Sequence, residues 1–190
     1  MKSLSLSQPH LIVMVGIPGS GKTFFAEKFA QTFRTPYVSH AVNLSFTGDD
    51  DTAYDIALYQ LGELLKTQQS ILVEGVAETR TERAELAKKA RKAGYETLFV
   101  WVQTDPVTAK NRLTKGKTAV MSSEEYDHQA KRFTPPSAVE HPIVISGKHT
   151  YATQAKVILK KLSAPRAEIS VHTTPLTRPA SQTRRNITIR

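Results

Sequence analysis

The chain has 190 residues, a length typical of one domain with some additional sequence. It contains no cysteine, which excludes a disulfide framework and any metal site built on thiolates. The formal net charge is +9, so we expect anionic partners such as nucleotides, nucleic acids or phosphorylated metabolites. The N-terminal segment holds no apolar stretch long enough for a signal sequence or a membrane span, and we expect a soluble, cytoplasmic protein without membrane association.

The first predicted element is a short apolar run that leads into a glycine-rich loop. Residues 11–15 read Leu-Ile-Val-Met-Val, which predicts a strand buried on both faces. Residues 16–23 read Gly-Ile-Pro-Gly-Ser-Gly-Lys-Thr, and residues 22–33 continue with the pattern of an amphipathic helix. Strand, loop and helix in this order indicate a Walker A phosphate-binding loop rather than a chance glycine-rich turn.

The spacing of this loop follows from what a phosphate group requires. Its glycines let successive backbone N–H groups converge on the phosphate oxygens, and the helix directs the positive end of its dipole at the same anion. We therefore predict a nucleoside triphosphate site, in which Lys22 reaches the β- and γ-phosphates and the Thr23 hydroxyl ligates Mg²⁺. The residues expected around the phosphates are Gly16, Pro18, Gly19, Ser20, Gly21, Lys22 and Thr23.

Strands and helices alternate along the rest of the chain. We expect strands at 36–39, 71–74, 97–102 and 142–146, and helices at 52–68, 80–93, 106–113 and 150–162. Asp51 is the predicted N-cap of the second helix, Gly94 the C′ residue of the third and Pro106 the N1 residue of the fourth. Nearly continuous apolar strands between helices predict an α/β fold, a five-stranded parallel sheet with helices on both faces. Such sheets bind ligands at the C-terminal ends of their strands.

The C-terminal segment, residues 163–190, differs from the rest in composition. It is rich in Ser, Thr, Pro and Arg, and its five arginines against one glutamate carry nearly half of the net charge. With few large apolar residues it cannot offset its ordering entropy, so we expect a basic, disordered tail after a domain of residues 1–162. The tail could bind nucleic acid without sequence preference, or it could serve only solubility.

The loop and the pattern that follows resemble the P-loop kinases grouped around polynucleotide kinase and zeta toxin, often described as AAA-type ATP-binding proteins. In that group the third strand ends in Asp, an Arg follows nine residues later, and a Gly-aromatic pair precedes the fourth strand. Here these positions hold Glu74, Arg83 and the pair Gly94-Tyr95, and the resemblance covers residues 11–162. For Arg83 two interpretations stay open, a contact to phosphate or acceptor and a place on a solvated, charged helix.

The resemblance implies the P-loop NTPase fold and an ATP-dependent kinase. Such an enzyme transfers the γ-phosphoryl group to a hydroxyl of a small molecule or of a polynucleotide end. A basic lid would begin at Arg112, include Lys115 and Lys117, and continue in a helix over 121–132. Arg112 would close over the γ-phosphate, and Glu74 would hold a Mg²⁺-bound water or orient the acceptor.

The resemblance leaves the general base open. The related kinases carry an Asp soon after the second strand as the base toward the acceptor hydroxyl, whereas residues 39–43 read Ser-His-Ala-Val-Asn here. His40 is the nearest candidate base, and Glu74 is the alternative. The missing Asp also keeps a second function in view, a nucleotide-binding module with weak or no transfer activity that associates with nucleic acid through its basic tail.

Overall fold

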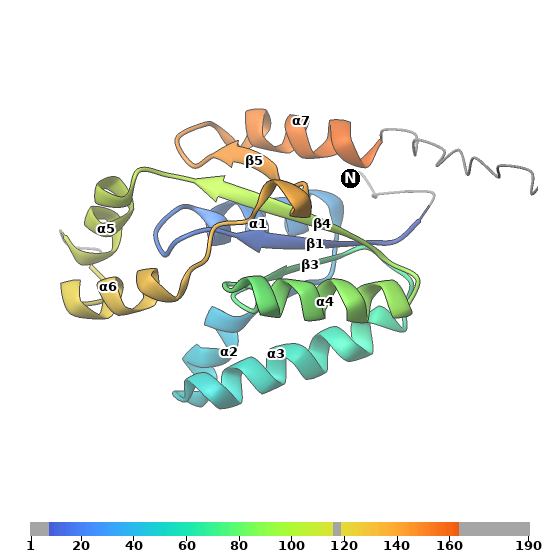
Figure 1. The fold of residues 1–190 in the computed structure, drawn as a ribbon, viewed down its shortest axis with the longest axis horizontal. Helices are drawn as coiled ribbons and strands as arrows, with labels where there is room; N and C mark the ends of the chain where they lie inside the picture. Colours follow the sequence, from blue (N-terminus) through green and yellow to red (C-terminus); the bar gives the residue numbers. More distant parts are fainter. Residues whose placement is uncertain (1–7, 116–118, 164–190) are drawn as a thin grey trace, which may run out of the picture.

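Five parallel strands form one sheet at the centre of the molecule, in the order β2-β3-β1-β4-β5. A computed structural model describes residues 8–115 and 119–163 (Figure 1). Its elements in chain order are β1 (His10–Val15), α1 (Lys22–Phe33), β2 (Tyr37–Ser39), α2 (His40–Thr47), α3 (Asp50–Leu65), β3 (Ile71–Glu74), α4 (Arg80–Lys92), β4 (Glu96–Gln103), α5 (Pro106–Thr114), α6 (Ser123–Arg132), the 3-10 turn η1 (Ala138–Glu140), β5 (Ile143–Ser146) and α7 (Tyr151–Leu162). Lys117 and the expected tail beyond Ser163 lie outside the described residues, so the tail's disorder and its contact with nucleic acid stay predictions.

Apolar side chains on both faces of the sheet explain why helices cover it twice. In the central strand β1, Leu11 and Val13 belong to one buried cluster and Ile12 and Met14 to the other. The neighbouring strands add to both clusters, and the helices that cover them are α3 and α4 on the first face and α1 and α7 on the second (Figure 1). The predicted three-layer P-loop NTPase fold is therefore confirmed.

Within residues 8–115 and 119–163, no helix is long and apolar enough to cross a bilayer.

All strands end at the same edge of the sheet, and the connections that leave this edge carry the polar side chains of interest. β1 runs into the glycine-rich loop, β2 into α2, β3 into residues 75–79 and β4 into α5. Helices α5 and α6 lie beyond this edge, at the left of Figure 1, where the sequence predicted a lid segment. Parallel sheets bind ligands outside the carboxyl ends of their strands, so this edge is where a site is expected.

Two local predictions were wrong, and both concern the chain between β2 and α3. The sequence predicted no helix over residues 40–47, yet α2 forms there with Ser39 as its N-cap and Gly48, whose φ is 69°, as its C-cap. Helix α3 then begins at Asp50, because the carboxylate of Asp49 rather than Asp51 accepts a hydrogen bond from the Thr52 N–H at 2.8 Å. In a run of three aspartates, propensity alone does not decide which residue is the cap. The predicted roles of Gly94 and Pro106 are confirmed.

Candidate functional site

The glycine-rich loop of residues 16–23, which we call the phosphate loop, leads from β1 into α1 and leaves space in front of the helix. Gly19 has a φ of 72°, and a Cβ there would lie 2.3 Å from the carbonyl oxygen of Ala109 in α5, so only glycine fits. Gly21 is the N-cap of α1 with a φ of 104°, and a Cβ there would meet no atom within 4 Å. The N-terminus of α1 therefore faces open space at the point where an anion would bind.

Lys22 curls back over the loop. Its ammonium group donates hydrogen bonds to the carbonyl oxygens of Gly16 at 2.6 Å and Ile17 at 3.0 Å. Burial lowers the pKa of Lys22, while the carboxylates of Glu74 and Glu78 oppose that shift. A phosphate group beside this ammonium would add negative charge and favour the protonated form. The lysine is thus held where the sequence predicts its contact with phosphate.

Glu74, at the end of β3, is almost fully buried and bonded to three hydroxyl groups. Its carboxylate accepts hydrogen bonds from Thr23 at 3.1 Å, from Ser39 at 3.0 Å and from the phenol of Tyr37. Burial and, after it, the charge of Glu74 raise the pKa of Tyr37, so that the phenol stays a donor. Glu74 is therefore not a solvated strand-end residue, because it links the phosphate loop to β2.

The pair of Thr23 and Glu74 offers the oxygen ligands that Mg²⁺ prefers. Within the described parts of the chain, no group of three or more His, Cys, Asp or Glu side chains could by itself hold a metal ion. Mg²⁺ in nucleotide sites is bound by one or two protein groups together with phosphate oxygens and water. The donor set present here fits a magnesium ion of that kind.

One cavity on the α7 side of the loop has a volume of about 470 Å³. Arg112 of α5 lies on its wall, where the guanidinium donates hydrogen bonds to the carbonyl oxygens of Gly19 at 3.1 Å and Gly147 at 3.3 Å. Arg112, which the sequence predicted as a site residue, therefore contacts the phosphate loop, although it lies 93 residues after Gly19 along the chain. Phe24 and His149 line the same cavity and were not anticipated. Phe24 gives a sequence signal, an aromatic residue in the exposed first turn of α1.

A second cavity of about 320 Å³ lies on the opposite side of the loop. Lys22, Thr23 and Glu74 form the end of this cavity that borders the phosphate loop. The remaining polar or charged side chains of its wall come from α2, α3, the β3–α4 connection, α4 and α6, and are His40, Asp50, Tyr54, Glu78, Glu82, Gln129 and Arg132. A small molecule in this cavity would lie next to a phosphate held by the loop.

Three of the carboxylate or imidazole groups in the wall of this cavity, His40, Glu74 and Glu78, differ in their hydrogen bonds. His40 has its Nε2 at 3.3 Å from a carboxylate oxygen of Asp50, and its Cβ packs against Gly75. Glu74 already accepts the three hydroxyl bonds described above. Glu78, which the sequence analysis missed, accepts no hydrogen bond at its carboxylate from any residue that the structure describes. Burial raises the pKa of Glu78, and the charges of Lys22 and Arg132 oppose the shift.

Arg83 does not follow either interpretation offered by the sequence. Its side chain is fully buried, so it neither reaches a ligand nor faces solvent. The guanidinium pairs with Glu140 at 2.5 Å and donates to the carbonyl oxygens of Glu78 at 3.1 Å and Thr134 at 2.9 Å. Arg83 therefore joins the β3–α4 connection to the segment that follows α6. We call Arg83, Glu140 and the backbone carbonyl groups of Glu78 and Thr134 the Arg83 clamp.

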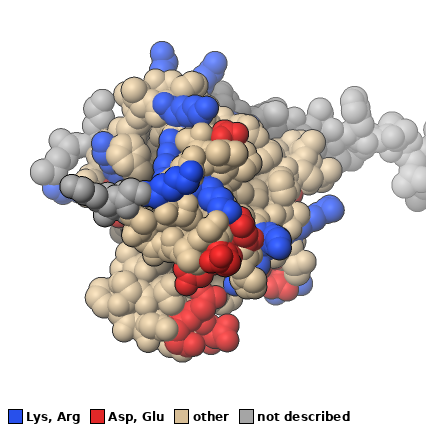
Figure 2. Space-filling model, turned by 90° about the vertical axis from the view of Figure 1, so that its left-hand side faces the viewer, with Lys and Arg blue, Asp and Glu red and all other residues tan. Residues whose placement is uncertain are grey.

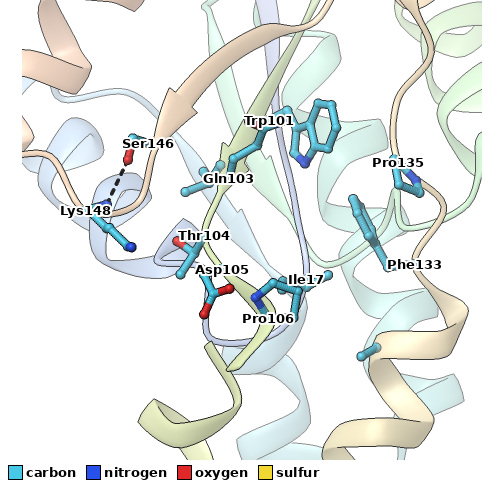
Figure 3. A pocket seen from close by; sticks show the side chains of 12 residues that line it. Ile17, Trp101, Gln103, Thr104, Asp105, Pro106, Phe133, Pro135, Ser146 and Lys148 are labelled. Atoms are coloured by element: carbon cyan, nitrogen blue, oxygen red, sulfur yellow. Dashed lines mark hydrogen bonds between the residues drawn. The ribbon is translucent and has the colours of Figure 1, made fainter. Parts of the chain in front are cut away.

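A third cavity, of about 650 Å³, lies beside β4 and contains little of the phosphate loop (Figure 3). Trp101, Phe133 and Pro135 lie on one side of it, and Asp105 and Lys148 on the other. The Asp105 carboxylate is engaged as the N-cap of α5, at 2.9 Å from the Thr108 N–H. Because Ile17 alone reaches it from the loop, we assign the phosphate chemistry to the two smaller cavities.

Several solved structures that share this fold are titled as kinases. A gluconokinase from Sinorhizobium meliloti matches with a TM-score of 0.62 and 21% identity, over 81% of this chain and 91% of that one. An APS kinase from Mycobacterium tuberculosis, in complex with AMPPNP and APS, matches with 0.64 and 18%, over 83% and 99%. A sugar kinase from Janibacter matches with 0.58 and 18%, over 80% and 93%. At these identities the likeness shows the P-loop kinase fold alone.

No curated protein sequence matches the chain. The predicted resemblance to P-loop kinases is confirmed for the fold, whereas the narrower branch of polynucleotide kinase and zeta toxin stays a prediction. A family model described as an AAA domain matches residues 11–136, most of the part that the structure describes, and the chain therefore belongs to this AAA domain family.

Proposed function

We propose that the protein binds ATP with Mg²⁺ and transfers the γ-phosphoryl group to a hydroxyl group of an acceptor. The observation that carries this proposal is that Gly19, Lys22 and Thr23 line both smaller cavities. A nucleotide on the α7 side and an acceptor on the α2 side would meet at the phosphate loop, as an in-line transfer requires. The chain itself supplies position and charge, because phosphoryl transfer needs little covalent chemistry from the protein.

The nucleotide would occupy the cavity of about 470 Å³. The loop amides and the ammonium of Lys22 bind phosphate oxygens, and the flat side chains of Phe24, Arg112 and His149 offer surfaces for a nucleobase. Thr23 and Glu74 would hold Mg²⁺, which when bound neutralises phosphate charge and orients the transferred group. Arg112 can leave its two carbonyl partners to approach the γ-phosphate, since both of those hydrogen bonds lie at the surface.

The test of this function is titration calorimetry with ATP and Mg²⁺ on the Lys22→Ala variant. We expect the ATP affinity to fall at least about tenfold, because a charge-assisted hydrogen bond to phosphate contributes roughly 1.5–3 kcal/mol. Lys156→Ala, an exposed change on α7, serves as the control and should bind ATP like the wild type. Equal affinity in all three proteins would contradict the nucleotide site. ATP binding without turnover under any condition would favour the alternative, a nucleotide-binding module without transfer activity.

A further inference from the structure

We propose that Glu78 accepts the proton of the acceptor hydroxyl, and that the acidic wall around it selects an acceptor without negative charge. This inference rests on the proposed phosphotransferase function and assigns the base and the substrate class of the same site. It replaces both sequence candidates for the base, His40 and Glu74, with a residue of the β3–α4 connection.

Hydrogen bonds of its backbone hold Glu78 at the wall of the cavity of about 320 Å³, which we call the acceptor cavity. Its carbonyl oxygen accepts a hydrogen bond from Arg83 at 3.1 Å, and its N–H donates to the carboxylate of Glu82 at 2.8 Å. Glu78 lines the cavity that Lys22 and Thr23 border, and the charge of Lys22 acts on its carboxylate. A fixed backbone and an unbonded carboxylate beside the phosphate loop are what a general base needs, because geometry decides the role before pKa does.

The two sequence candidates are less suited to take a proton. Glu74 accepts bonds from Thr23, Ser39 and Tyr37, so that its oxygens are occupied by three hydroxyl donors. His40 places its Nε2 beside Asp50, and its ring lies against the backbone at Gly75. A proton on Glu74 would compete with its three hydroxyl donors, and His40 has one ring nitrogen beside Asp50 and the other packed near Gly75.

The surroundings of Glu78 also make its carboxylate more basic, because they raise its pKa. Burial raises its pKa from the ordinary value, and the neighbouring carboxylate of Glu82 in α4 acts in the same direction. Lys22 at the start of α1, Arg132 of α6 and His40 of α2 oppose the shift. A carboxylate with a raised pKa binds the proton of an alcohol better than an ordinary one does.

A bond forms between the acceptor oxygen and the γ-phosphorus of ATP, and the bond between that phosphorus and the β–γ bridging oxygen breaks. The hydroxyl proton passes to the Glu78 carboxylate, ADP leaves with the bridging oxygen, and Glu78 later releases its proton to water. No oxidant, reductant or further reactant is needed.

The charge of the cavity wall argues for the substrate class. Among the residues that the structure describes, four carboxylates line it, from Asp50, Glu74, Glu78 and Glu82. With Glu74 assigned to Mg²⁺ and Lys22 to phosphate, three carboxylates remain against two possible cations of the described wall, Arg132 and His40, and both of these lie within 3.5 Å of Asp50. Figure 2 looks onto this end of the molecule, and most of its acidic side chains lie in the lower half, toward α2 and α3 of Figure 1. Such a wall disfavours sugar phosphates, hydroxy acids and polynucleotide ends, and it suits amino alcohols or uncharged polyols.

The first experiment tests Glu78 with water as the acceptor, so that no acceptor has to be known. Steady-state ATP hydrolysis and ATP affinity are measured for the wild type, Glu78→Gln, Glu78→Asp and the exposed control Glu63→Gln. We expect Glu78→Gln to lower kcat at least about a hundredfold, the lower range for a positioned base, with the ATP affinity within about twofold of the wild type. Glu78→Asp keeps a carboxylate and should recover part of the rate.

Unchanged hydrolysis in Glu78→Gln would overturn the assignment of the base. A loss of ATP affinity in that variant would overturn it too, because it would show that Glu78 supports the nucleotide site instead. A wild type that binds ATP yet neither hydrolyses nor transfers it would refute the proposed function itself, which distinguishes the two failures.

The second experiment tests the charge of the acceptor. The protein is incubated with γ-³²P-labelled ATP and four separate pools: amino alcohols, uncharged polyols and nucleosides, sugar phosphates with hydroxy acids, and a 5′-hydroxyl oligonucleotide. We expect labelled product in the first or second pool. Label confined to the anionic pools, or absent from the first two, would overturn the charge assignment.

Discussion

The two sides of the phosphate loop are built in different ways. The side that would bind phosphate comes from one contiguous segment, residues 16–23, with the helix that follows it. The acceptor side is assembled from α2, α3, the β3–α4 connection and α6, which are separated along the chain by tens of residues. A local segment can carry its geometry in its sequence, whereas an assembled wall depends on the contacts that hold its parts together.

The Arg83 clamp is the contact that holds the acceptor side. It fixes the carbonyl of Glu78 on one side and the segment of Thr134 and Glu140 on the other, and none of its members belongs to the phosphate loop. The loop has its own internal bonds, from Lys22 to the carbonyl oxygens of Gly16 and Ile17. If the two sides are independent, damage to the clamp should change the acceptor side and spare the phosphate side.

The largest effect is expected from Arg83→Ala. Removal of this side chain leaves the carboxylate of Glu140 and the carbonyl oxygens of Glu78 and Thr134 without their buried donor. Breaking a buried ion pair by removing one partner destabilises a protein by about 3–5 kcal/mol. Urea unfolding should show this loss, and Lys88→Ala, an exposed change on the same helix, should stay within about 0.5 kcal/mol of the wild type.

The same variant tests the independence of the two sides. At a temperature where Arg83→Ala is folded, its affinity for ATP should remain close to that of the wild type, while its turnover falls because Glu78 is no longer held in place. Equal losses of affinity and turnover would show that the clamp supports the phosphate loop as well, and the contrast between the two sides would not hold.

A somewhat smaller effect is expected when the clamp is broken by acid. Burial opposes ionisation of Glu140, but hydrogen bonds from Arg83 and Ser137 prevail and lower its pKa to about 2 from an ordinary 4.5. The unfolded chain therefore binds more protons between these values, and stability rises with pH across that window. The contribution of Glu140, about 3 kcal/mol for a shift of this size, is complete above about pH 4.5 and is lost as the pH falls toward 2.

Unfolding free energies measured from pH 2 to pH 7 for the wild type and Glu140→Gln provide the check. The variant should be less stable at pH 7, and its curve should approach that of the wild type as the pH falls below 4.5. A constant difference across the range would mean that the pKa of Glu140 is not lowered by the fold.

The order of strand, loop and helix predicted the connection from β1 to α1, and the apolar strands predicted the parallel sheet with its two covered faces. The burial of Arg83 was not predicted, because α4 is dense in charge. The buried positions of that helix, Arg83, Leu86 and Ala90, nevertheless follow the three- and four-residue spacing of an apolar stripe. That spacing was the signal in the sequence that could have predicted the burial of Arg83. No sequence pattern marked Glu78, because its place in the cavity depends on the Arg83 clamp and thus on Glu140, which lies far along the chain.

Arg112 gives the sharpest distinction between the two sides, because it comes from α5 yet contacts the phosphate loop. If it stabilises the charge that develops on the γ-phosphoryl group, Arg112→Ala should lower kcat about a hundredfold, or about 2.7 kcal/mol, with a much smaller change in ATP affinity. The reverse result, weaker ATP binding with kcat unchanged, would assign Arg112 only to the wall between Gly19 and Gly147. Kinetics of ATP hydrolysis together with calorimetry separate the two outcomes, and Lys110→Ala on the same helix is the matched control, because its ammonium pairs with Asp127 on α6 instead of contacting the loop. An effect confined to kcat would place Arg112 with the transferred phosphate, which both sides of the loop share.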